Sequence, residues 1–126
     1  MSRLTVVKDY LNIALSNAQE VITKFSADVV TDPQYAFTWA DRAFEASGKV
    51  RVCEQTLLQI ERLGVDHGNG VPSEEEILRH VLKGFQDSIL SDACYTPSSS
   101  SPSSNMTELA LRTARASIYR EIRYDV

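Results

Sequence analysis

The sequence has 126 residues, of which 43% are hydrophobic and 24% are charged, and its formal net charge is −4. This size and composition are typical of one globular domain with its own core, and the net negative charge argues against general nucleic-acid binding. Two cysteines are too few for a disulfide framework. No run approaches the ~20 apolar residues of a membrane span, and charged residues interrupt the first apolar segment, unlike in a signal peptide. We therefore expect a soluble cytoplasmic protein.

The first predicted helix runs from Arg3 to Phe25. Its apolar residues recur three and four positions apart, which is the spacing of one buried helix face. They are Leu4, Val7, Leu11, Ala14, Ala18, Val21 and Phe25. Ser2 precedes this pattern and is a favourable N-cap residue. We expect a turn over residues 26–32, after which the next helix packs antiparallel to the first.

The longest periodic pattern in the sequence spans Pro33 to Leu63. Apolar residues occupy two positions of a heptad over about four repeats, as in helices that pack together. They are Ala36, Ala43, Val50 and Leu57 at one position, and Trp39, Ala46, Cys53 and Ile60 at the other. Asp32 can cap this helix, and Pro33 suits its first position. Gly48 falls on the outer side of the register, so we expect one long helix, with a break at Gly48 as the alternative.

A further apolar stripe lies beside this heptad face. Phe37, Phe44 and Leu58 share a third heptad position, which widens the apolar arc beyond what one neighbouring helix covers. The long helix is therefore expected to be central in its bundle or shared with another chain. Tyr35 and Trp39 add aromatic side chains, for which interface packing is favoured over stacking on a planar ligand. We predict an interface made of Tyr35, Phe37, Trp39, Phe44 and Leu58.

Two further helices and a linker complete the expected organisation. Ser73 followed by Glu76 is a capping box, which marks the start of a helix over about 74–93. Residues 96–105, TPSSSSPSSN, have the composition of a flexible linker. A last helix over about 106–123 follows. Its apolar stripe consists of Leu111, Ala114, Ile118 and Ile122.

Side chains that bind metals occur without the spacing typical of metal sites. Cys53, Cys94, His67 and His80 form neither C-x-x-C nor H-x-x-x-H pairs. The loop over 65–72 does not match an EF-hand, and its glycines favour a plain helix connection. The sequence contains no glycine-rich phosphate loop and no nucleophile motif. We therefore expect no metal, no cofactor and no enzymatic activity.

Four arginines project from the last predicted helix within an arc of about 140°. They are Arg112, Arg115, Arg120 and Arg123. Arginine binds phosphate and carboxylate groups bidentately, so this set predicts a site for a small anionic ligand such as a nucleotide. The alternative is a solvated face whose last arginines complement the C-terminal end of the helix dipole.

Together these patterns predict an all-α fold in a single domain over residues 1–126. We expect an antiparallel up-down bundle of about four helices with one long central helix. The leading functional prediction is a non-enzymatic interaction protein that self-associates or docks a protein partner through the apolar face of the long helix. The second is a binder of a small anionic ligand at the arginine-bearing helix, at a subunit interface. We expect a homo-oligomer without nucleic-acid or membrane partners.

Overall fold

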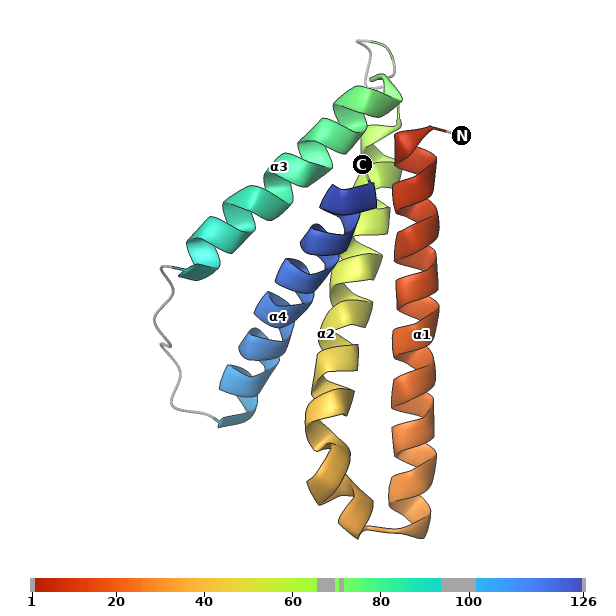
Figure 1. Cartoon of the computed structure of the whole chain (residues 1–126), viewed down its shortest axis with the longest axis vertical. Helices are drawn as coiled ribbons and strands as arrows, with labels where there is room; N and C mark the ends of the chain where they lie inside the picture. The colour runs from red at the N-terminus through yellow and green to blue at the C-terminus, as the bar shows by residue number, and fades with distance from the viewer. Residues whose placement is uncertain (1, 66–69, 71, 94–101, 126) are drawn as a thin grey trace.

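A computed structural model shows four α-helices in the part of the chain that it describes (Figure 1). The described backbone covers residues 2–65, 70, 72–93 and 102–125, and the side chains of 35–37, 92–93, 102–107 and 124–125 are left out. The helices are α1 (Arg3–Thr31), α2 (Gln34–Leu63), α3 (Glu74–Ala93) and α4 (Pro102–Asp125). The predicted all-α bundle of four helices is confirmed.

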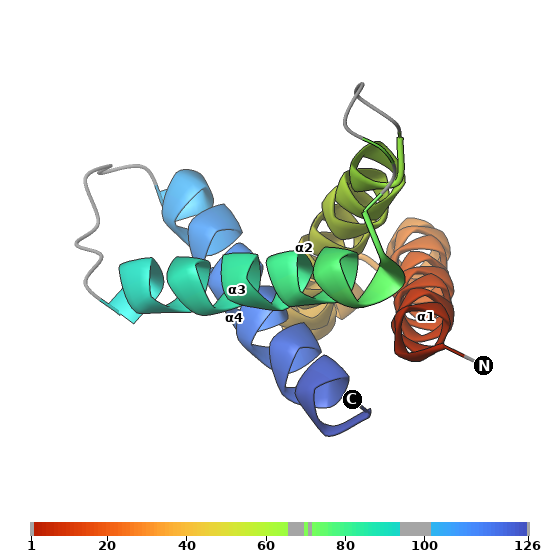
Figure 2. The same cartoon turned by 90° about the horizontal axis from the view of Figure 1, so that it is seen from above.

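Successive helices run in opposite directions along the chain. Only the axes of α1 and α2 are nearly parallel. α4 packs on the other side of α2, and α3 diverges from α2 towards its own C-terminal end (Figure 1). Seen from above, α3 crosses α4 at a large angle (Figure 2). All four helices contact one another, and the two most extensive contacts are those of α2 with α1 and with α4. α2 is therefore the central helix of the bundle, as the width of its apolar arc predicted.

The core lies where α1, α2 and α4 converge. Val7, Leu11, Cys53, Ile118 and Ile122 are at most 1% exposed there. α3 covers this cluster with its apolar face, which consists of Ile77, Leu78, Val81 and Phe85. The single-face spacing of the apolar residues in α1, α3 and α4 is what allows each helix to bury one side in a common core.

α1 extends beyond its predicted end at Phe25 and continues to Thr31. The predicted turn over 26–32 is therefore wrong. Asp32 ends the helix in an extended conformation, with φ −140° and ψ 96°. This conformation follows from Pro33, because a proline disfavours helical backbone in the residue before it. Half-buried Val29 continues the buried face of α1 through the segment that was expected to turn.

α2 is continuous through Gly48, and this glycine is buried. The prediction that Gly48 lies on the outer side of the helix is wrong. The heptad register considered one buried face, whereas α2 packs against α1 on one side and α4 on another. Val52 and Thr56 are buried for the same reason. The Thr56 hydroxyl donates a hydrogen bond of 2.7 Å to the Val52 carbonyl, which satisfies it inside the core.

The starts of α3 and α4 test two further sequence predictions. The Glu76 backbone N–H donates to Ser73 Oγ at 3.2 Å, which confirms Ser73 as the cap of α3. α4 begins at Pro102, a favourable first residue of a helix, rather than at 106. Residues 102–105 of the predicted linker are therefore helical, and residues 96–101 lie outside the described part of the chain.

Candidate functional site

An open groove runs between α1 and α4, with α2 as its floor. It consists of three adjoining hollows of about 410, 560 and 280 Å³, all of which include Glu45 in their walls. The walls come from α1 between Tyr10 and Val21, from α2 between Asp41 and Lys49, and from α4 between Leu109 and Arg120. We call this the α1–α4 groove. The backbone of α4 diverges from α1 towards the N-terminal end of α4 (Figures 1 and 2).

The rim of the α1–α4 groove is apolar and exposed. Ile13 and Val21 on α1 are 61% and 42% exposed, and Leu109 on α4 is 62% exposed. All three line the groove. Large apolar side chains that gather around a concave surface are typical of interaction sites, whereas scattered ones are ordinary. This rim is therefore the best candidate for a binding surface in the described structure.

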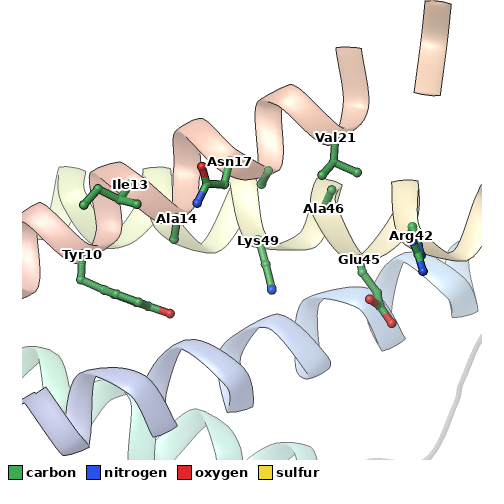
Figure 3. A pocket seen from close by; sticks show the side chains of 10 residues that line it. Tyr10, Ile13, Ala14, Asn17, Val21, Arg42, Glu45, Ala46 and Lys49 are labelled. Carbon is green, nitrogen blue, oxygen red and sulfur yellow. The ribbon is translucent and has the colours of Figure 1, made fainter. Parts of the chain in front are cut away.

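The floor of the groove continues the face of α2 that is buried in the core. Ile60 and Cys53 on this face are at most 4% exposed. One to three turns towards the N-terminus, the same face carries Lys49, Glu45 and Arg42, because residues three or four apart share a side of a helix. Figure 3 shows these side chains extending from α2 into the space between α1 and α4. The face thus changes from apolar to charged towards the N-terminal end of α2.

The groove contains three cationic side chains, from Arg42, Lys49 and Arg120. The Arg42 guanidinium lies over the Trp39 ring, 4.1 Å from its centroid, a cation–π arrangement. Among the described residues, no carboxylate oxygen lies within 4.0 Å of the Lys49 or Arg120 cation. These two charges are therefore directed into the groove without a close internal counter-ion in the described structure.

The predicted interface residues divide between several environments. Phe44 is half-buried and lines the groove beside Leu109 and Ala110. Trp39 is half-buried, and its ring contacts the guanidinium of Arg42, which lines the groove. Leu58 is 44% exposed on α2, outside the groove. The side chains of Tyr35 and Phe37 lie outside the described residues.

The four predicted ligand-binding arginines do not line one common hollow. Arg120 faces the α1–α4 groove, whereas Arg115 lines a separate hollow of about 270 Å³ between α2, α3 and α4. Arg123 lies over the Tyr119 ring at 5.8 Å from its centroid, and Arg112 is half-buried. Within the described structure, then, only Arg120 of this set joins the other cations of the groove.

Cys53 is fully buried in the core next to the groove floor. Burial raises the pKa of its thiol from 9.0 to about 11, an effect that nearby Lys49 partly opposes and Glu54 adds to. A thiol that stays protonated at neutral pH is a poor nucleophile and a poor metal ligand. Cys53 is therefore a core residue, as its position in the heptad pattern indicated.

The described part of the chain contains neither a metal site nor a membrane-spanning helix. Among the described side chains, no group of three or more His, Cys, Asp or Glu residues is placed to hold a metal ion. None of the four helices, over the residues that the structure covers, combines the length and apolar character needed to cross a bilayer. No protein-family model, curated protein or solved structure matches the chain.

The groove and its cations Arg42 and Lys49 were not predicted from the sequence. Both residues are polar positions between the apolar residues of the long helix. A signal was present, because Lys49 and Arg42 continue the face of Cys53 and Ile60. Whether these residues are covered or line a groove depends on the direction in which α4 crosses α2. The sequence pattern does not give that direction.

Proposed function

We propose that this chain is a non-enzymatic interaction protein of the cytoplasm that self-associates and docks a protein partner through helical surfaces on and beside α2. As an oligomeric adaptor, it would hold partners by helix packing instead of acting on a substrate. The observation that carries the proposal is the exposure of large apolar side chains next to α2. Ile13, Val21 and Leu109 surround the groove over α2, and Leu58 is exposed on α2 itself.

Physical considerations support this proposal. Burial of apolar area contributes about 25 cal/mol per Å², so covering several such side chains gives a favourable contribution to association. Leu58 and half-buried Phe44 share a heptad position of α2, two heptads apart, with exposed Arg51 at the same position between them. Aromatic residues and leucines on rigid helices also lose little entropy on binding, because their backbone is already ordered.

The experiment is a dilution series followed by NMR of the methyl groups of the full-length protein. If the protein self-associates through the α2 stripe, the Leu58 methyl signals shift with concentration, while those of buried Leu11 do not. Leu90, which is 68% exposed on α3, is the matched exposed control. Methyl signals independent of concentration would contradict self-association through α2. Equal shifts for Leu58 and Leu90 would indicate non-specific aggregation and would also contradict it.

A second candidate function, binding of a small anionic ligand, is favoured by one observation. Arg120 and Lys49 line the same hollow of about 560 Å³ together with one acidic residue, Glu45, and two neighbouring cations attract phosphate groups. Inorganic phosphate should then raise the melting temperature more than chloride at equal ionic strength. The shift should disappear in Lys49→Gln/Arg120→Gln. Equal effects of the two anions would argue against this function.

A further inference from the structure

The α1–α4 groove has the form of a V in which α1 and α4 converge at one end. At the closed end, Val7, Cys53 and Ile122 from the three helices form the core. Towards the open end, the walls of the groove carry exposed apolar side chains, Ile13 and Val21 on α1 and Leu109 on α4. A helix laid between α1 and α4 would extend the core along α2 and cover these three side chains at once.

The size of the groove fits a short helix. Its α1 wall extends from Tyr10 to Val21 and its α4 wall from Leu109 to Arg120. Each wall therefore spans 11 residue steps, which corresponds to roughly 16 Å at 1.5 Å per residue. An occupant of about three helical turns matches this length. Its apolar residues would recur at three- and four-residue spacing in order to contact both rims.

The charged residues of the groove indicate the chemistry of the segment that would occupy it. The chain has a net charge of −4, yet the two larger hollows contain Arg42, Lys49 and Arg120 against one carboxylate, that of Glu45. Lys49 and Arg120 have no described carboxylate within 4.0 Å. Covering them with an apolar or basic segment would remove their hydration without compensation, which is costly. Acidic side chains along the edge of the occupant would satisfy them.

We infer that the α1–α4 groove binds an acidic amphipathic helix of another protein, with its apolar face on Ile13, Val21 and Leu109 and its carboxylates beside Lys49 and Arg120. This inference rests on the proposed function and names the chemistry of the partner. It is separate from self-association through Leu58, which lies outside the groove. A second copy of this chain and a small anion are the competing occupants.

The test is selection of peptides from a display library against the immobilised full-length protein. The library consists of helical peptides of about 14 residues with apolar residues at every third or fourth position and equal frequencies of acidic and basic residues elsewhere. The inference predicts enrichment of sequences with Asp or Glu along one edge of the apolar face. Affinity of the best peptide should fall as salt rises from about 0.05 to 0.5 M, because rim charges are screened.

Two variants with the same change in charge locate the binding site. Lys49→Glu/Arg120→Glu should weaken the selected peptide roughly tenfold or more, since it replaces attraction by repulsion. Arg79→Glu/Lys83→Glu alters exposed residues of α3 and should leave affinity unchanged. Val21→Ser, which removes one apolar rim contact without changing charge, should also weaken binding. Circular dichroism of each variant checks that the helices remain formed.

Several outcomes would overturn the inference. These are no enrichment, enrichment without acidic bias, or equal effects of the two charge reversals. If Lys49→Glu/Arg120→Glu abolished self-association and no acidic peptides were selected, the groove would be assigned to a second copy of the chain. A phosphate effect on melting temperature without peptide binding would assign it to a small anion. Peptide selection and the peptide affinities do not depend on whether Leu58 mediates self-association, so the two proposals fail separately.

Discussion

Gly48 in α2 lies directly against the backbone of Ala110 in α4. A Cβ atom on Gly48 would be 2.5 Å from the Ala110 carbonyl oxygen and 2.7 Å from its carbonyl carbon. Non-bonded atoms do not approach so closely, so the crossing of α2 and α4 requires the absence of a side chain at this position. The contact at Gly48 therefore sets how closely α4 packs on α2, next to the groove.

Gly48→Ala is expected to destabilise the protein. Alanine gains up to about 1 kcal/mol in helix propensity, but overpacking a filled contact typically costs about 1–3 kcal/mol because both helices must move. We expect a net loss of about 1–2 kcal/mol in the free energy of unfolding. Urea denaturation of the wild type and of Gly48→Ala measures this change in the free energy of unfolding.

Gly84 is the matched control for this substitution. It lies within α3, and a Cβ placed there would meet no atom within 4 Å. Gly84→Ala should therefore stabilise the protein by up to about 1 kcal/mol, the ordinary propensity gain. If Gly48→Ala is as stabilising as Gly84→Ala, the close approach of α2 and α4 described here is incorrect.

The buried position of Gly48 also shows what could and could not be predicted from the sequence. Apolar periodicity located the helices well, and local capping by Ser73 fixed the start of α3, because these signals involve neighbouring residues. Periodicity placed Gly48 on the outer side of the helix, since a glycine at a helix crossing has no side chain that would mark its position as buried. The extension of α1 past Phe25 was predictable, because Val29 continues its buried face and Pro33 is the next strong stop signal.

The candidate site was less predictable than the fold for a related reason. Phe44 and Arg120 were both identified, but as members of two different sites on two different helices. Only the oblique path of α4 places them along one groove with Lys49. Crossing angles depend on side-chain packing across helices far apart in sequence, which a pattern within one helix does not encode.

Cys53 should make stability dependent on pH in the alkaline range. Its pKa is about 11 in the folded protein and 9.0 in an unperturbed thiol, so the folded state holds the proton more tightly. The stabilisation is fully present below pH about 9 and is lost as the pH rises to about 11. Over this interval, stability should fall by up to about 2–3 kcal/mol more in the wild type than in Cys53→Ala.

Urea denaturation at several pH values, with both proteins in a Cys94→Ser background, isolates this contribution. The Cys53→Ala protein controls for the titration of tyrosine and lysine side chains in the same pH range. Parallel pH dependences of the two proteins would mean that the Cys53 thiol is accessible to water in the folded state.

The hydrogen bond between α3 and α4 should contribute modestly to stability. Gln86 Nε2 donates to Tyr119 Oη at 2.8 Å, and the Tyr119 ring stacks on Phe85 with centroids 6.3 Å apart. Tyr119→Phe removes the hydrogen bond and retains the ring. Because the bond is exposed, we expect a cost of less than about 1 kcal/mol. A double-mutant cycle with Gln86→Ala should show coupling of similar size, and an absence of coupling would show that the bond does not persist in solution.

The rim of the groove should be dispensable for folding. Ile13 is 61% exposed, whereas nearby Leu11 is fully buried in the core. Ile13→Ser should change the free energy of unfolding by no more than about 0.5 kcal/mol, as is usual for surface positions. Leu11→Ala should cost about 2–5 kcal/mol, since it leaves a cavity. A large cost for Ile13→Ser would mean that the rim is part of the core and not a free binding surface.

The molar mass in solution, measured by light scattering as the protein concentration is raised to tens of micromolar, tests the proposed interaction function most directly. The proposal predicts a mass above the 14.1 kDa of one chain, which returns towards that value in Leu58→Ser but not in the exposed control Leu90→Ser. A mass of 14.1 kDa at every concentration would contradict self-association through α2.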